Sequence, residues 1–132
     1  PPGTGDEPLS VCQFIPNASG IIIVTTPQDV AILDARKSVL FAHELNIPVA
    51  GIIENMSGFV CPHCQVETNI FKKGGGERAA KELRVPFLGG VPFQPEFVDF
   101  GDKGTPFVSF HHKSKSADAF MDIVKKIEEF IG

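Results

Sequence analysis

The sequence has no tryptophan or tyrosine, only three cysteines and no long apolar run. Because all 12 aromatic residues are phenylalanine, the core has to be built from Phe, Ile, Val and Leu. The longest apolar runs, residues 21–24 and 49–53, are far too short to span a bilayer, so we expect no membrane helix. The 12 Lys and Arg residues are outnumbered by 16 Asp and Glu, and the resulting charge of −4 argues against nucleic acid as a partner.

The cysteine count and the first residues indicate where the protein works. Three is an odd number, and two of the cysteines form a close pair, which is not the pattern of a secreted disulfide framework. The chain begins with neither Met nor a signal segment, so we expect a start cut from a longer protein. These features favour a reducing, cytoplasmic setting. The 132 residues, 42% of them hydrophobic and 21% charged, fit one globular domain.

Two apolar runs predict strands on either side of a helix. Residues 20–25 form a β-branched run typical of parallel strands covered by helices on both faces. Thr26 offers an N-cap hydroxyl, Pro27 suits the first helical position, and Asp29 lies near the first-turn amides. Residues 49–55 then predict a second strand that ends in polar residues. The helix between them has an apolar stripe at three- and four-residue spacing: Ala31, Ala35, Val39, Ala42 and Leu45.

The second half of the chain repeats this alternation after an irregular segment. Residues 56–76 have no sustained period and contain a Cys-x-x-Cys, which predicts a loop excursion from the sheet. We expect a short helix at 77–84, a short strand at 87–91 ended by Pro92, and then a C-terminal helix packed on the sheet. Asp122, Lys126 and Glu129 of that helix should face solvent. Its predicted buried stripe comprises Ala117, Phe120, Met121, Val124, Ile127 and Ile131.

The predicted fold class is therefore α/β, with a partial parallel sheet flanked by helices. Residues 1–132 would form a single domain in which 56–76 is the Cys-x-x-Cys loop. In such sheets ligands bind at the carboxyl ends of the strands, which here are residues 25–29, 54–56 and 91–93.

The sharpest chemical motif is Cys61-Pro62-His63-Cys64, because two thiolates three positions apart can chelate one metal centre. Zinc and iron-sulfur centres need about four protein ligands, so two chains would each have to supply two. Thiol-disulfide exchange is an alternative, although a thioredoxin-like site places its first cysteine at a helix N-terminus and residues 65–69 are a poor helix start. A pair of unmetallated surface thiols is the third interpretation. His63 could ligate zinc or simply face solvent.

Other candidate residues carry weaker signals. Residues 2–6 form a glycine-rich turn that could face a phosphate, with Asp6 near a metal or a water, or could be an ordinary turn. Asn55 could read a purine edge or cap a turn. Cys12 is better explained as a small buried residue than as a ligand. No G-x-x-x-x-G-K-[ST] phosphate loop is present, and Gly74-Gly75-Gly76 suggests a flexible lead into the next helix. We assign no chemistry to three residues: His43, His111 and His112.

Several blocks, taken in order along almost the whole chain, resemble the Mrp/ApbC-type iron-sulfur cluster carrier ATPases of the MinD/ParA-like P-loop class. They are PPGTGD at 1–6, TTPQDVAILDARK at 25–37, GIIENMSGF at 51–59, CPHC at 61–64, FKKGGG at 71–76 and PFLGGVP at 86–92.

The resemblance implies a cytoplasmic homodimer that binds ATP and Mg²⁺ and carries a [4Fe-4S] cluster between its subunits for transfer to apoproteins. Cys61 and Cys64 match the cluster ligands of the family. Gly3 and Asp6 match a segment near the γ-phosphate, Asn55 matches a residue that contacts adenine, and Pro92 lies where the backbone passes the base. Zinc could replace the cluster in isolated material, and a zinc-bridged dimerisation module remains an alternative function.

The sequence departs from the family in one large respect, because the N-terminal half with its Walker A lysine loop is absent. These residues would then be the C-terminal part of a P-loop domain, and we expect negligible ATPase activity from them alone, since little would stabilise the transferred phosphate. Missing central strands would also leave an open sheet edge, so that the chain could be marginally stable or self-associate.

Overall fold

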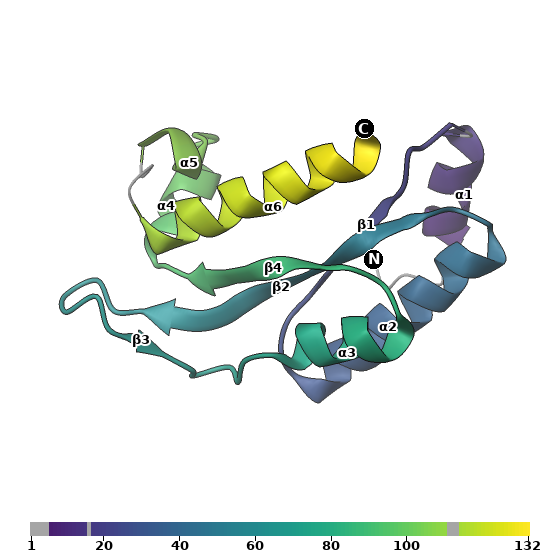
Figure 1. The fold of residues 1–132 in the computed structure, drawn as a ribbon. Helices are drawn as coiled ribbons and strands as arrows, with labels where there is room; N and C mark the ends of the chain where they lie inside the picture. Colours follow the sequence, from purple (N-terminus) through teal and green to yellow (C-terminus); the bar gives the residue numbers. More distant parts are fainter. Residues whose placement is uncertain (1–5, 16, 111–113) are drawn as a thin grey trace.

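The computed structural model describes residues 6–15, 17–110 and 114–132, which form a layered α/β arrangement (Figure 1). For Asp6 and Glu7 the description covers the backbone alone. In chain order the elements are α1 (Asp6–Phe14), β1 (Ile21–Thr25), α2 (Asp29–Glu44), β2 (Val49–Val60), β3 (Glu67–Thr68), α3 (Gly75–Leu83), β4 (Phe87–Phe93), α4 (Glu96–Asp102), α5 (Phe107–Phe110) and α6 (Lys115–Ile131).

The long strand β2 is the centre of the sheet. β1 pairs with it in parallel, from Ile21 opposite Val49 to Thr25 opposite Glu54. β4 pairs with it in parallel as well, while the two-residue β3 pairs with its last residues in antiparallel fashion. The predicted α/β fold with parallel strands and flanking helices is thus confirmed. No helix among the described residues is long and apolar enough to cross a bilayer.

Helices pack on both faces of the sheet, and each face has its own apolar cluster. α2 and α3 cover one face, whereas α6 lies across β4 on the other (Figure 1). The first cluster joins β1 and β2 to α2 and α3, and its members are Ile23, Ile32, Ala35, Val39, Ile52, Ala79 and Ala80. The second joins β4 to α6 and consists of Leu88, Val91 and Ile123.

The predicted burial of the first strand on both faces is wrong. Ile23 is buried, but Ile22 and Val24 point the other way and are 39% and 61% exposed. The reason is that α6 packs on β4 and leaves the outer face of β1 uncovered.

The start of α2 also differs from the prediction. The helix begins at Asp29 with Gln28 as its N-cap residue, and no side chain caps it. Thr26 is therefore not the cap. Pro27 is fully buried, and it precedes an extended Gln28 rather than opening the helix. Within the helix, the predicted residues Ala35, Val39 and Ala42 are buried, and Ile32 replaces Ala31 at the start of the stripe.

The buried face of α6 is rotated from the predicted one. Ala117 is buried as expected, but Ile123 is the central contact, while Phe120, Met121, Val124 and Ile131 are 38–61% exposed. Gly89 of β4 explains the choice, because a Cβ at that position would lie 2.9 Å from Ile123 Cγ1. Lys126 is exposed as expected, and its Nζ also donates to the Leu88 carbonyl at 2.6 Å.

Element ends differ from the sequence prediction as well. β2 continues to Val60, five residues into the predicted excursion, and β4 runs through Pro92 to Phe93. The β2–β4 register shifts between Asn55 and Phe59, and a shift of this kind accommodates a strand proline that has no N–H to donate. α3 starts at Gly75, two residues early, and α1 was not predicted at all.

Candidate functional site

The Cys-x-x-Cys motif lies on a tight turn that follows β2 directly. The Cys61 N–H donates to the Val66 carbonyl at 3.1 Å, and the Gln65 N–H donates to the Cys61 carbonyl at 2.9 Å. Gln65 adopts a left-handed conformation with φ of 57°, which turns the chain back toward β3. Cys61 is half-buried, Cys64 is exposed, and both are free thiols. The turn therefore presents two sulfur ligands at the end of the sheet.

Local hydrogen bonding acts on the Cys61 thiol. The backbone N–H of Cys64 lowers the pKa of Cys61, with smaller contributions in the same direction from the His63 N–H and the Cys64 thiol. A lowered pKa favours the thiolate, which is the form that binds metals and acts as a nucleophile. Cys61 lies in a turn and does not begin a helix, so this shift comes from the turn itself and not from a helix N-terminus as in thioredoxin-like sites.

The turn offers the two cysteine thiols as ligands. Among the described residues no group of three or more His, Cys, Asp or Glu side chains could hold a metal ion. Cys12 lies in α1 at the opposite end of the sheet, in a pocket that includes Pro48. β2 separates that pocket from Cys61, and its 12 residues span on the order of 35 Å. Cys12 therefore cannot join Cys61 and Cys64 on one ion within a chain.

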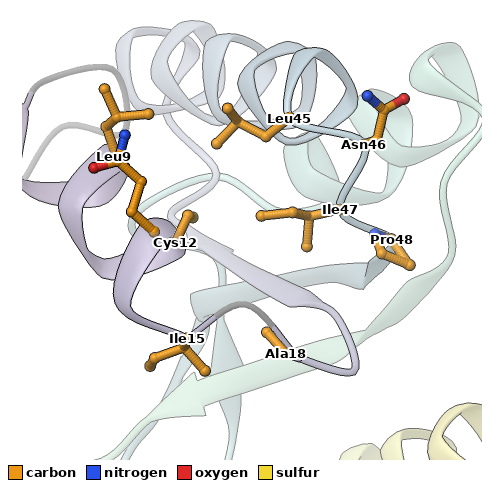
Figure 2. Close-up of a pocket in the computed structure, with 9 residues that line it drawn as sticks. Leu9, Cys12, Ile15, Ala18, Leu45, Asn46, Ile47 and Pro48 are labelled. Atoms are coloured by element: carbon orange, nitrogen blue, oxygen red, sulfur yellow. The ribbon is translucent and has the colours of Figure 1, made fainter.

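Figure 2 shows the pocket around Cys12, with a volume of about 270 Å³, between α1 and the connection from α2 to β2. Cys12 is half-buried rather than buried, so the prediction of a small core residue holds only in part. The pocket is lined by Leu9, Cys12, Gln13, Ile15, Ala18, Leu45, Asn46, Ile47 and Pro48. None of these side chains is charged, and none belongs to the Cys-x-x-Cys turn.

The predicted nucleotide-site residues are only partly brought together. Asn55 pairs in register with Val91, the residue before Pro92, so it lies in the middle of β2 and near the carboxyl end of β4. Asn55 Oδ1 accepts from the Met56 N–H at 2.9 Å, as in a turn cap, and its side chain is exposed. The Pro92 carbonyl accepts from Ser116 Oγ at 3.0 Å. Gly3 lies outside the described residues, as does the side chain of Asp6, whose backbone begins α1.

Glu54, a fully buried carboxylate in β2, was not among the residues predicted from the sequence. Oε1 accepts from Ser57 Oγ at 2.6 Å and from the Gly74 N–H at 2.8 Å, and Oε2 accepts from the Gly76 N–H at 2.6 Å. Two signals were available: a charged residue in an apolar strand, and a helix start with three glycines and no capping side chain of its own. Neither signal reveals that the two belong together, because they are 20 residues apart.

Gly75 and Gly76 are closely packed at the start of α3, so the flexible lead predicted from the composition of residues 74–76 is wrong. A Cβ at Gly75 would lie 2.6 Å from the Pro27 carbonyl oxygen, and one at Gly76 would lie 3.1 Å from Glu54 Cβ. Gly74 has a φ of 83°, a conformation that favours glycine. The glycines thus allow α3 to begin directly against β2 and the start of α2.

Two ion pairs fix the chain segment that leads from the cysteine turn back to α3. Lys73 Nζ contacts Glu67 Oε1 of β3 at 2.5 Å, and Lys72 Nζ contacts Asp29 Oδ2 of α2 at 2.7 Å. Asp29 forms this ion pair rather than capping its own helix, and the Lys72 ammonium lowers the pKa of its carboxyl group. Both pairs are largely exposed, so each contributes little to stability.

Comparisons with known proteins identify the family. Residues 1–128 match the ParA family model described as the NUBPL iron-transfer P-loop NTPase. The chain belongs to this family. It is 54% identical over 129 residues to the iron-sulfur cluster carrier protein of Methanocaldococcus jannaschii, covering 98% of this chain and 44% of that protein. It is 46% identical over 136 residues to the cytosolic Fe-S cluster assembly factor CFD1 of Candida glabrata, covering 98% and 47%.

Solved structures agree with this family assignment. A nucleotide-binding protein in complex with ADP from Archaeoglobus fulgidus matches with a TM-score of 0.68 and 35% identity, over 79% of this chain and 42% of that one. The cell division ATPase MinD of Pyrococcus furiosus matches in fold alone, with a TM-score of 0.64 and 22% identity over 82% and 41%. The chain spans less than half the length of these proteins. The resemblance to iron-sulfur carriers of the MinD/ParA-like class is confirmed.

Proposed function

We propose that this chain is the cluster-holding part of an iron-sulfur carrier, in which Cys61 and Cys64 of two copies hold a [4Fe-4S] cluster for transfer to apoproteins. The observation that supports it is a projecting turn with two free thiols, which no third metal-binding side chain joins among the residues that the structure describes, in a family described by iron transfer. Four thiolates complete such a cluster, so the ligand count requires a second chain. The name of the relative from Candida glabrata supports a cytosolic location.

The two thiols suit a ligand set from which the cluster is also released. Backbone hydrogen bonds hold Cys61 and lower its pKa, which favours its thiolate. Cys64 is exposed, which would allow an acceptor thiolate to displace it first. Stepwise exchange of this kind keeps the cluster ligated throughout the transfer.

ATP and Mg²⁺ belong to the same proposal, with Gly3, Asp6, Asn55 and Pro92 next to the nucleotide. Asn55 would offer its amide N–H₂ to the base, because its Oδ1 already accepts from Met56. For these residues alone we expect no hydrolysis, since no Walker A lysine is present to stabilise the phosphate. A phosphate-release assay with the 132-residue chain checks this, and magnesium-dependent turnover would contradict it.

Anaerobic reconstitution with iron and sulfide tests the cluster site. We expect a brown product in the wild type, and loss of iron and colour in the double variant Cys61→Ser/Cys64→Ser. Cys12→Ser is the matched control, because it removes a thiol at the other end of the sheet and should retain the cluster. If the double variant binds as much iron as the wild type, or if Cys12→Ser loses it, the assignment of these ligands is wrong.

A zinc-bridged dimer is a second candidate, since the same two thiols from each of two chains would satisfy a tetrahedral ion. Metal and sulfide analysis distinguishes a zinc-bridged dimer from a cluster-bridged one, because a zinc site contains neither iron nor sulfide. Thiol-disulfide exchange is a third candidate, favoured by the lowered pKa of Cys61. It requires catalysed disulfide turnover that Cys61→Ser abolishes, and a wild type without such turnover excludes it.

A further inference from the structure

Both ends of the Cys-x-x-Cys segment meet at one buried carboxylate. The chain leaves the sheet after Val60, forms the cysteine turn and β3, and returns at Gly74 to begin α3. Glu54 lies in β2 just before the segment and accepts hydrogen bonds from Ser57 on the outgoing strand and from Gly74 and Gly76 on the return. These four residues, Glu54, Ser57, Gly74 and Gly76, form what we call the clasp.

The clasp requires a carboxylate. An ionised Glu only accepts hydrogen bonds, and here three donors converge on its two oxygens. Two of these donors are backbone N–H groups at the start of α3, which has no capping side chain of its own. The partial positive charge at that helix end favours a negative group further. Glu54 is 0% exposed, so no water competes with these donors.

The surrounding backbone packs closely around the clasp. A Cβ at Gly90 of β4 would lie 2.6 Å from Ser57 Oγ, and one at Gly76 would lie 3.3 Å from Glu54 Oε2. Neighbouring segments thus enclose the carboxylate and the hydroxyl, so a change at either one moves the segment rather than rearranging locally.

Between the clasp and the cysteines, β2 is irregular. Met56 and Gly58 have φ values of 56° and 96°, and the pairing with β4 shifts register at this point. The Ser57 hydrogen bond lies between these two residues and fixes the irregular stretch that leads to Cys61. The ion pairs of Lys72 and Lys73 are exposed, so they hold the return path less firmly than the buried clasp.

We propose that Glu54 is a positioning residue for Cys61 and Cys64: by tying Ser57 to Gly74 and Gly76, it holds the turn in the geometry that retains the metal centre. This inference rests on the proposed function of the cysteine pair. It predicts that weakening the clasp speeds the loss of iron while the fold persists.

The test compares two buried serines in the reconstituted protein. Ser57→Ala removes a hydrogen bond from the clasp, and Ser116→Ala removes an equally buried one between α6 and β4. We expect iron loss to a chelator to be about tenfold faster in Ser57→Ala, as for other residues that orient metal ligands. Ser116→Ala should lose iron at the wild-type rate. Glu54→Gln should lose it faster still, because its N–H₂ would face a backbone N–H.

A second readout uses the protein without iron. Hydrogen exchange at the Gln65 amide, which donates to the Cys61 carbonyl, should be faster in Ser57→Ala than in Ser116→Ala. If Ser57→Ala loses iron and exchanges the Gln65 amide at the wild-type rates, Glu54 has no positioning role. The same holds if Ser116→Ala accelerates iron loss and exchange as much as Ser57→Ala does. If the wild type takes up no iron, the proposed function fails, and the exchange comparison alone decides the role of Glu54.

Discussion

At the residue scale, the two thiols of the Cys-x-x-Cys motif differ in their surroundings. The turn directs the N–H groups of His63 and Cys64 toward the Cys61 sulfur, while Cys64 remains exposed. Spacing alone identified the pair, because two cysteines three positions apart are distinctive in a chain with only three. The difference in their hydrogen bonding and exposure depends on the geometry of the turn, which the sequence did not indicate.

This difference predicts the pH dependence of alkylation. Because the pKa of Cys61 is lowered, its thiolate persists to lower pH than that of an ordinary cysteine. The rate of Cys61 alkylation by iodoacetamide, followed by peptide mass spectrometry, should therefore reach half its maximum at a lower pH in the folded protein than in urea. Equal midpoints in the two states would show that the turn does not stabilise the thiolate.

At the element scale, the contact between α3 and the start of α2 is the tightest backbone approach around the site. Gly75 has no room for a Cβ, because the carbonyl of the buried Pro27 would lie 2.6 Å away. Gly75 is thus needed for close packing, because the backbone atoms of Pro27 cannot move aside as the end of a flexible side chain can.

Gly75→Ala should accordingly lower the free energy of unfolding by about 1–3 kcal/mol through overpacking. Gly101→Ala is the matched control in α4, where an added Cβ meets no atom within 4 Å. That substitution should leave stability unchanged or raise it by up to about 1 kcal/mol through helix propensity. Urea unfolding followed by circular dichroism measures both, and equal effects would contradict the tight contact.

The sequence predicted those elements whose pattern is local. It did not predict features that depend on contacts with a distant segment of the chain. The stripe of α2 was recognisable because Ala35, Val39 and Ala42 repeat on one face. The face of α6 was not, since Gly89 of β4 selects Ile123 as the contact. The end of β2 was misjudged because Met56 and Gly58 interrupt strand alternation without ending the strand. Glu54 could not be found because its partners begin α3, 20 residues later.

At the scale of the whole molecule, the sheet has an open edge at β1. Among the described strands, β1 has a partner only on its β2 side, and Val24 is 61% exposed on its outer face. An edge of this kind pairs readily with another strand. Two copies could therefore associate through β1 without any cluster, so a dimer is informative only when its dependence on iron and on the cysteines is measured.

The most direct test of the account is native mass spectrometry of the reconstituted protein under anaerobic conditions. We predict two chains carrying one cluster with about four irons, and removal of the iron should remove the cluster-dependent dimer. Cys61→Ser/Cys64→Ser should remain free of iron at the same protein concentration. A cluster held by a single chain, or a cluster-bearing dimer that persists in the double variant, would contradict the claim that two Cys61–Cys64 pairs hold the cluster between subunits.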